Sequence, residues 1–134
     1  RRQGTEMSLF DSSAIINLCG EKKLDKLLGE WTLNLAFYEL GNAVWRQVRV
    51  LRTITVNEAN TVLDPLIEVF ERLKKPETEH ALEILKMAVK ENLTFYDSSY
   101  IHTAIENGLK LVTDDEQLQK IARKYVKTIT SNEL

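Results

Sequence analysis

Hydrophobic positions along the chain follow two spacings, which predict two kinds of secondary structure. Short apolar runs predict strands at residues 7–10, 31–34, 109–112 and 125–130. Residues 67–70 alternate apolar and polar side chains, which favours one more strand, with a helix as the alternative. Longer stretches with helical spacing predict helices at residues 14–28 (broken at Gly20), 35–50, 56–66, 76–91, 94–107 and 113–124.

Proline, glycine and capping residues indicate where these helices begin and end. Pro65 interrupts the helix at 56–66, and Pro76 suits the first turn of the next helix. Gly108 is a good C-terminal residue for the helix that precedes it. The segments 94–97 and 113–116 resemble capping boxes, each with a threonine followed three residues later by an acid.

The alternation of strands and helices predicts the class of fold. It favours a parallel sheet of four or five strands covered by helices on both faces, a three-layer α/β/α domain. The 134 residues, 43% of them hydrophobic, suit a single domain over residues 7–134. Residues 1–6 are polar and precede Met7, so we interpret them as a flexible N-terminal extension or a remnant of expression.

Composition excludes several classes of protein. No apolar stretch approaches the ~20 residues that a membrane span needs, and we expect no association with membranes. The one cysteine, Cys19, allows neither an internal disulfide nor a cysteine zinc site, which favours a cytoplasmic location. A net charge of −2 argues against a protein that coats nucleic-acid duplexes.

Four acidic residues lie where the predicted strands end or where helices begin. Asp11 follows the first strand and Asp115 the strand at 109–112, while Glu39 and Asp97 lie in the opening turns of helices. The carboxyl ends of parallel strands meet at one edge of a sheet, which is where ligands bind in open α/β folds. We therefore expect the four carboxylates to converge. The alternative is that each acid only complements a helix dipole.

Clustered carboxylates indicate a definite chemistry. Like charges a few Å apart disfavour ionisation, and a divalent cation relieves their repulsion. Ligand sets made only of oxygen select Mg²⁺ or Mn²⁺ over Zn²⁺. Such an ion can hold a substrate phosphate and activate water, so hydrolysis of phosphodiesters is the expected reaction.

Four segments of the chain resemble the four motifs of PIN domains, and most closely those of VapC-type toxins from toxin–antitoxin pairs. They are FDSSA at 10–14, LAFYEL at 35–40, LTFYDSSY at 93–100 and LVTDD at 111–115. The resemblance extends from about Met7 to the C-terminus. It implies a sheet order of 3-2-1-4-5 and an endoribonuclease that depends on Mg²⁺ or Mn²⁺.

The same resemblance implies roles for individual residues. Asp11, Glu39, Asp97 and Asp115 match the family's catalytic and metal-binding acids. Ser13 and Thr113 match residues that support the site, and Asp114 fills the variable position beside Asp115.

The resemblance also implies partners. They are an RNA substrate, a cognate antitoxin protein and a second copy of the chain in a homodimer, with Trp31 and Trp45 as candidate interface residues.

Other residues allow more than one interpretation. Arg46 and Arg49 lie on one helical stripe with Arg52 and can bind RNA phosphates, or they can complement the helix dipole. The chain's two histidines, His80 and His102, are expected to have structural roles, since His102 should face away from the acids.

The sequence leaves three alternative functions open. The first is a PIN nuclease that processes RNA outside any toxin–antitoxin pair. The second is a non-catalytic module with the PIN fold that holds a partner's arginine in its acidic cleft. The third is a phosphoacceptor receiver domain, although Asp11 lacks the second acid that such domains place near the first strand.

Overall fold

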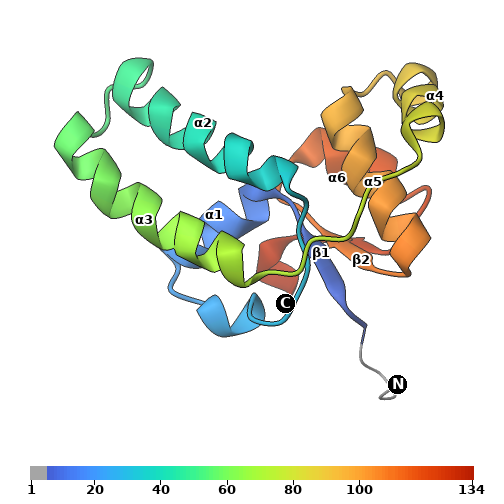
Figure 1. The fold of residues 1–134 in the computed structure, drawn as a ribbon, viewed down its shortest axis with the longest axis horizontal. Coiled ribbons are helices and arrows are strands. Elements are labelled where there is room, and N and C mark those ends of the chain that lie inside the picture. Colours follow the sequence, from blue (N-terminus) through green and yellow to red (C-terminus); the bar gives the residue numbers. More distant parts are fainter. Residues whose placement is uncertain (1–5) are drawn as a thin grey trace.

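A parallel sheet of three strands runs through the centre of the computed structural model, which describes residues 6–134 (Figure 1). β1 (Ser8–Phe10) pairs with β2 (Lys110–Val112), and β2 pairs with β3 (Thr128–Ile129). The prediction of four or five strands therefore exceeds the three strands that residues 6–134 form. Of the expected extension at 1–6, residues 1–5 lie outside the described residues.

Two single-residue bridges continue the sheet beyond β1. Trp31 forms parallel bridges with Leu9 on one side and with Lys74 on the other. Backbone hydrogen bonds support both, from Phe10 N–H to the Trp31 carbonyl and from Thr32 N–H to the Lys74 carbonyl. Five segments thus lie side by side: β1, Trp31, Lys74, β2 and β3. Counted in this order along the chain, their spatial order is 3-2-1-4-5, although only three are long enough to be strands.

Helices connect these segments and cover the sheet. Most predicted helices are confirmed, with shifts at their ends. They are α1 (Ser12–Gly20), α2 (Leu35–Arg49), α3 (Val56–Arg72), α4 (Ala81–Glu91), α5 (Phe95–Asn107) and α6 (Glu116–Ala122), with short 3₁₀ turns η1 (Leu24–Lys26) and η2 (Ser131–Glu133). Within residues 6–134, every helix is too short or too polar to cross a lipid bilayer.

The prediction that favoured a strand at residues 67–70 was wrong, because this segment is the last part of α3. The helix continues through Pro65 to Arg72. Its buried side chains Leu66, Val69 and Phe70 keep the helical spacing and pack against the core. Burial of this face outweighs the hydrogen bond that the proline removes.

Two helix starts were also misplaced. α4 begins at Ala81, so Pro76 lies in the connection before the helix instead of in its first turn. α6 is capped by Asp115, whose side chain accepts the backbone N–H of Leu118. Thr113 is not the cap, because its hydroxyl is engaged with Asp11 and with the backbone N–H of Asp115.

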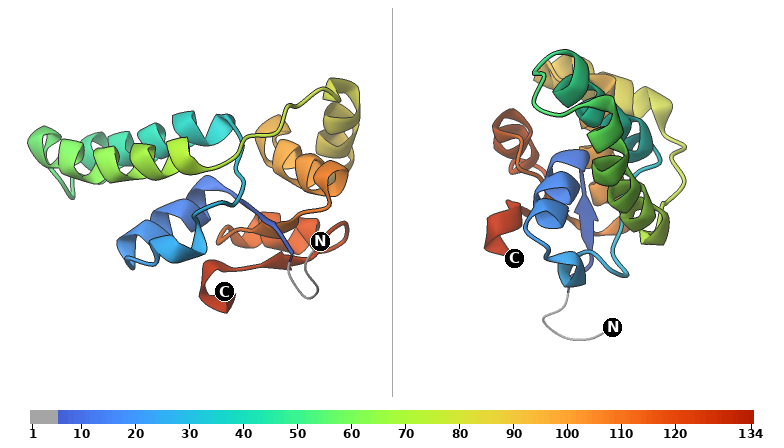
Figure 2. Two further views of the ribbon diagram at one scale, coloured as in Figure 1. Left: turned by 60° about the horizontal axis from the view of Figure 1, so that its bottom comes forward. Right: turned by 90° about the vertical axis from the view of Figure 1, so that its left-hand side faces the viewer.

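Two hydrophobic cores lie on opposite faces of the sheet and confirm the layered α/β architecture. Phe10 and Val112 point into a core formed with α1, α2 and α3. Leu9 and Leu111 point the other way, into a core formed with α5 and α6. Adjacent strand residues alternate between faces, so a short strand serves both cores. α4 packs against α5, and the views in Figures 1 and 2 show α2 and α3 as a helical pair on the other side of the molecule.

Candidate functional site

Asp11 is the most constrained acid at the carboxyl edge of the sheet. It directly follows β1, caps α1 and is only 5% exposed. Its Oδ1 accepts the Ala14 backbone N–H at 3.0 Å and the Ser13 hydroxyl at 2.7 Å. Its Oδ2 accepts the Thr113 hydroxyl at 2.5 Å, from the residue that follows β2. Both oxygens are therefore held in place, and Ser13 and Thr113 lie where supporting residues were expected.

Glu39 is positioned by a tyrosine that lies far from it in the sequence. The hydroxyl of Tyr100, on α5, donates a hydrogen bond to Glu39 Oε1 at 2.6 Å. Tyr100 is 1% exposed, so its ring is fixed in the core and its hydroxyl orients the carboxylate of α2. Ser12 also hydrogen-bonds to the Glu39 side chain. No spacing in the sequence assigns these roles to Tyr100 and Ser12, because both contacts with Glu39 join residues of different helices.

Asp97 and Asp115 complete the acidic edge. Asp97 lies in the first turn of α5, where its backbone N–H donates to the Thr94 hydroxyl that caps the helix. Asp115 caps α6 at the end of the connection from β2. The charge of Asp115 raises the pKa of Asp97, which indicates that the two carboxyl groups are electrostatic neighbours.

Electrostatic repulsion links all four acids in series. Burial, with a smaller contribution from the charge of Glu39, raises the pKa of Asp11 to about 6 in spite of its hydrogen bonds. Burial raises the pKa of Glu39 as well, with a contribution from Asp97. Burial is again the main reason that the pKa of Asp97 is raised, with Asp115 as the second cause. The structure thus brings the four acids together along one edge, which we name the acidic edge.

The side chains of the acidic edge fit a hard divalent cation by their chemistry. They offer only carboxylate oxygens, and their mutual repulsion would be relieved by positive charge. Among residues 6–134, no three of these acids have ligand oxygens that all lie within 4.8 Å of one another. At this spacing, one ion would contact at most two of these carboxylates directly and would complete its coordination with water, as Mg²⁺ commonly does.

Asp114 has a different role from its neighbour. Its carboxylate accepts hydrogen bonds from the Asn17 side chain at 2.7 Å, the Ser131 backbone at 2.8 Å and the Ser131 hydroxyl at 2.7 Å. These contacts tie η2 to α1. Its backbone N–H donates to the Ser13 hydroxyl, so Asp114 supports the acidic edge through its main chain.

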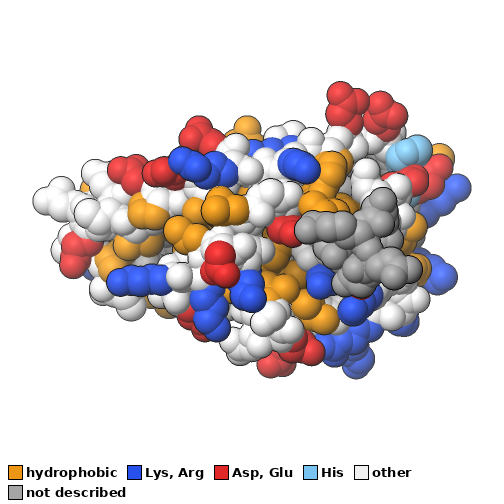
Figure 3. Space-filling view, turned by 90° about the horizontal axis from the view of Figure 1, so that it is seen from below, with side chains coloured by type: hydrophobic (Ala, Val, Ile, Leu, Met, Phe, Trp, Pro, Cys, Tyr) orange, Lys and Arg blue, Asp and Glu red, His pale blue; other side chains and the backbone are white. Residues whose placement is uncertain are grey.

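A groove adjoins Glu39 along the exposed side of α2. Its volume is about 520 Å³. The residues that line it are Leu35, Tyr38, Glu39, Asn42, Ala43, Arg46 and Tyr96. Arg46 therefore shares the groove with Glu39, as their spacing on the helix predicts, whereas Arg49 is exposed further along α2. Charges of both signs are interspersed over the face drawn in Figure 3, in keeping with the net charge of −2.

Cysteine, histidine and tryptophan side chains lie away from the acidic edge. Cys19 is half-buried and packs against the core of α1, α2 and α3. His80 and His102 lie together with Glu106, and the spacing of His102 and Glu106 on α5 is the sequence signal for this contact. Trp45 is 53% exposed, but Trp31 is half-buried beside Lys74, so it is a poor interface candidate.

An α/β/α domain with a parallel sheet and an acidic edge defines the class of protein to which this chain belongs. Comparison with known families identifies that class. The family model of the PIN domain matches residues 8–124, and the chain belongs to the PIN domain family.

Individual relatives come from the archaeon Pyrobaculum aerophilum. The chain is 36% identical to exonuclease VapC9 over 115 residues, which cover 82% of this chain and 81% of the relative. It is 37% identical to ribonuclease VapC3 over 105 residues, or 74% of this chain and 73% of the relative. The crystal structure of PAE2754 from the same organism superimposes with a TM-score of 0.81 and 31% identity, covering 96% of this chain and 92% of that one.

Proposed function

We propose that this chain is a cation-dependent ribonuclease that hydrolyses RNA phosphodiester bonds and acts as the toxin of a toxin–antitoxin pair. The observation that carries the proposal is the series of four carboxylates coupled by repulsion at the acidic edge. The relatives named exonuclease VapC9 and ribonuclease VapC3 support the same class of reaction.

Each acidic residue has a task that its surroundings explain. Asp11, held by Ser13, Thr113 and Ala14, is a fixed ligand for Mg²⁺ or Mn²⁺. When bound, such an ion would polarise the scissile phosphate and lower the pKa of water. Glu39 and Asp97, both with a raised pKa, are the groups best suited to accept a proton from attacking water. Asp115 adds a further carboxylate beside Asp97 and orients α6.

The groove along α2 supports RNA as the substrate. Tyr38 is 71% exposed and Tyr96 59%, and both line the groove next to Glu39. Exposed aromatic rings stack on unpaired bases, and Arg46 can bind a backbone phosphate. The groove therefore suits a single strand whose backbone passes Glu39, with Arg49 further along α2 as a second phosphate contact.

A cleavage assay tests the nuclease function. Single-stranded RNA labelled at its 5′ end is incubated with the protein and Mg²⁺ or Mn²⁺, beside DNA of the same sequence. Asp11→Asn and Asp97→Asn should each lower the rate by at least about 100-fold, because the first weakens the hold on the cation and the second removes a proton acceptor. Asp64→Asn, at an exposed position of α3, is the matched control. Equal rates in the wild type and both site variants would refute the proposal.

The products distinguish modes of cleavage and the alternative without catalysis. Internal fragments from an RNA labelled at its 5′ end indicate an endonuclease, and a ladder of single-nucleotide steps indicates an exonuclease. A chain that cleaves neither RNA nor DNA but binds an arginine-rich peptide would instead be a binding module of the PIN fold.

The role as a toxin has its own test. Expression of the wild type should arrest the growth of the host, and expression of Asp11→Asn should not. Coexpression of the protein encoded next to this chain's gene should restore growth if that protein is the antitoxin. Activity on RNA without growth arrest would place the enzyme in RNA processing. Light scattering of the purified protein tests the expected homodimer.

A further inference from the structure

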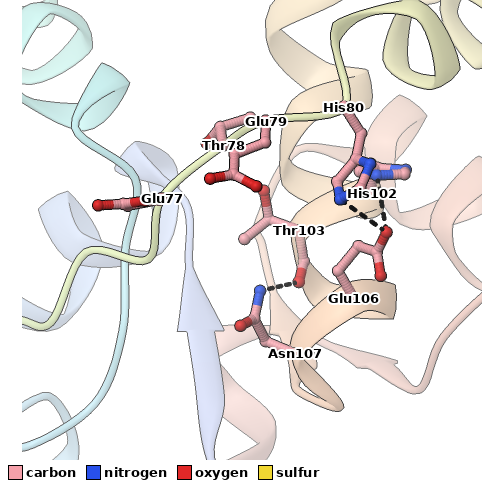
Figure 4. A pocket seen from close by; sticks show the side chains of 8 residues that line it. All are labelled: Glu77, Thr78, Glu79, His80, His102, Thr103, Glu106 and Asn107. Carbon is pink, nitrogen blue, oxygen red and sulfur yellow. Dashed lines mark hydrogen bonds and ion pairs between the residues drawn. The ribbon is translucent and has the colours of Figure 1, made fainter.

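A second group of candidate metal ligands lies on the outer side of α5, apart from the acidic edge. His80 immediately precedes α4, and His102 and Glu106 lie one turn apart on α5. The Nε2 atoms of His80 and His102 lie 3.3 and 3.4 Å from the same atom, Glu106 Oε1. All three ligand atoms lie within 4.8 Å of one another, and Figure 4 shows the side chains pointing toward a common position.

The contact with Glu106 does not give the His102 imidazole a hydrogen bond. The His102 side chain is 12% exposed, and its Nε2 atom is shielded from solvent without a hydrogen-bond partner. A buried nitrogen without a partner carries a desolvation cost that a bound ligand would remove. Both Nε2 atoms lie near one carboxylate oxygen, and because the His102 Nε2 makes no hydrogen bond to it, a shared cation would give that nitrogen a partner.

The distances fit a tetrahedral ion. Zn²⁺ binds imidazole nitrogen and carboxylate oxygen at about 2.0–2.2 Å, so neighbouring ligand atoms of a tetrahedral site lie roughly 3.3–3.5 Å apart. The two distances to Glu106 Oε1 match this spacing. Imidazole also favours Zn²⁺ over Mg²⁺, which prefers oxygen. From this geometry we infer that His80, His102 and Glu106 form a zinc-binding site.

The surroundings leave space for a fourth ligand. A cavity of about 210 Å³ adjoins the cluster and is also lined by Glu77, Glu79, Thr103 and Asn107. This volume accommodates a water molecule as the fourth ligand. The chain has only two histidines, so the histidine surface at one end of the face in Figure 3 belongs to this site.

A zinc ion at this site would cross-link two parts of the structure. A bound ion would link the connection before α4 to the C-terminal half of α5, whose first turn carries Asp97. The site neither requires the proposed nuclease activity nor contributes a ligand to the acidic edge. It would stabilise the packing of α4 on α5 because the ion binds the folded arrangement and not the unfolded chain.

Calorimetry with Zn²⁺ tests the inference. The full chain, purified without a histidine tag and stripped of metal, carries Asp11→Asn and Asp97→Asn, which remove two of the four carboxylates of the acidic edge and weaken any binding of Zn²⁺ there. We expect one Zn²⁺ per chain. His80→Gln and His102→Gln, each added to this background, should weaken binding at least about tenfold, a loss that even outer-sphere partners cause. Glu106→Gln should weaken binding in the same way, and Glu71→Gln, at an exposed position of α3, should leave it unchanged as the matched control.

Further measurements keep the test decisive. Zn²⁺ at 100 times its dissociation constant should raise the midpoint of thermal unfolding by about 10 °C, and His80→Gln should abolish this shift. His80 is 49% exposed, so this substitution leaves the fold intact even if His102→Gln does not. Zn²⁺ affinities of His80→Gln within twofold of the parent, or no binding to the parent, would overturn the inference. His80→Gln in the native chain should keep its cleavage of RNA with Mg²⁺, which separates this outcome from the nuclease test.

Discussion

Among single residues, Asp11 is subject to two opposing effects on its pKa: hydrogen bonds lower it, and burial raises it. Three hydrogen bonds stabilise its carboxylate, yet burial and Glu39 keep its pKa raised to about 6. The folded protein therefore binds a proton at Asp11 more tightly than the unfolded chain, whose aspartate has a pKa near the ordinary value of 3.8. Without a cation, the free energy of unfolding should fall as the pH rises from about 4 to 6.

Substituting Asp11→Asn should stabilise the protein while it abolishes cleavage. The pKa difference of about 2 corresponds to about 3 kcal/mol at pH 8, and a neutral amide removes this cost while its oxygen still caps α1. Unfolding by urea in EDTA at pH 8 should show a gain of about 1–3 kcal/mol, and at pH 4 little difference. A loss of stability at pH 8 would contradict the assigned cause of the raised pKa.

Substitution of the adjacent acids should affect different properties: stability at Asp114 and the cleavage rate at Asp115. Asp114→Ala removes the three hydrogen bonds that its carboxylate accepts from α1 and η2 and should lower the free energy of unfolding by about 2–3 kcal/mol. Asp115→Asn keeps an oxygen for the cap of α6 but removes a charge beside Asp97, so it should lower the cleavage rate with a small effect on stability. Urea unfolding and cleavage rates measured on both variants distinguish the two roles.

Among the secondary-structure elements, α3 shows how burial can outweigh local preference. Pro65 lies in the interior of the helix, where it removes one backbone hydrogen bond. The helix nevertheless continues, because Leu66, Val69 and Phe70 extend its apolar face against the core shared with α1 and α2. Its N-terminus is fixed by a capping box between Thr55 and Glu58.

Replacing Pro65→Ala should therefore stabilise the protein. The side chain is exposed, so the change leaves the core intact and restores a helical N–H, with an expected gain of about 1–3 kcal/mol. Glu71→Ala, at another exposed position of α3, should change stability by less than about 0.5 kcal/mol. Thermal and urea unfolding of both variants measure the difference. Destabilisation by Pro65→Ala would mean that the proline contributes packing or rigidity that the helix needs.

Across the molecule as a whole, the acidic edge joins three helices and the ends of two strands. Asp11 follows β1, Glu39 lies on α2, Asp97 on α5, and Asp115 lies between β2 and α6. Repulsion among these residues opposes the packing of the elements that carry them. A divalent cation should therefore stabilise the complete fold and not one helix alone.

The expected result is a shift in thermal unfolding that depends on pH. Mg²⁺ at 100 times its dissociation constant should raise the unfolding midpoint by about 10 °C at pH 8. The shift should shrink at pH 5, because protons compete with the ion at Asp11, whose pKa is about 6, and at Glu39 and Asp97, whose pKa values are also raised. Calorimetric scans of the wild type and of the variant with Asp11→Asn and Asp97→Asn provide the comparison, and an equal shift in both proteins would place the ion elsewhere.

Local sequence patterns were sufficient to predict the alternation of strands and helices and the position of each acid along it. Strand and helix periods depend only on neighbouring residues, so the apolar runs that precede Asp11 and Asp115 assign both acids to strand ends. The four motifs are also short runs of consecutive residues, so their resemblance to the PIN family could be recognised from the sequence. The family match confirms this resemblance.

Tertiary packing determined which local patterns prevail and which distant side chains meet. Residues 31 and 74 form single bridges, and residues 67–70 complete a helix, because packing energy depends on partners that the local pattern does not contain. The contacts of Tyr100 with Glu39, of Asp114 with Ser131 and of His80 with Glu106 all join separate elements. Such contacts arise when helices pack on a sheet, and no spacing along the chain encodes them.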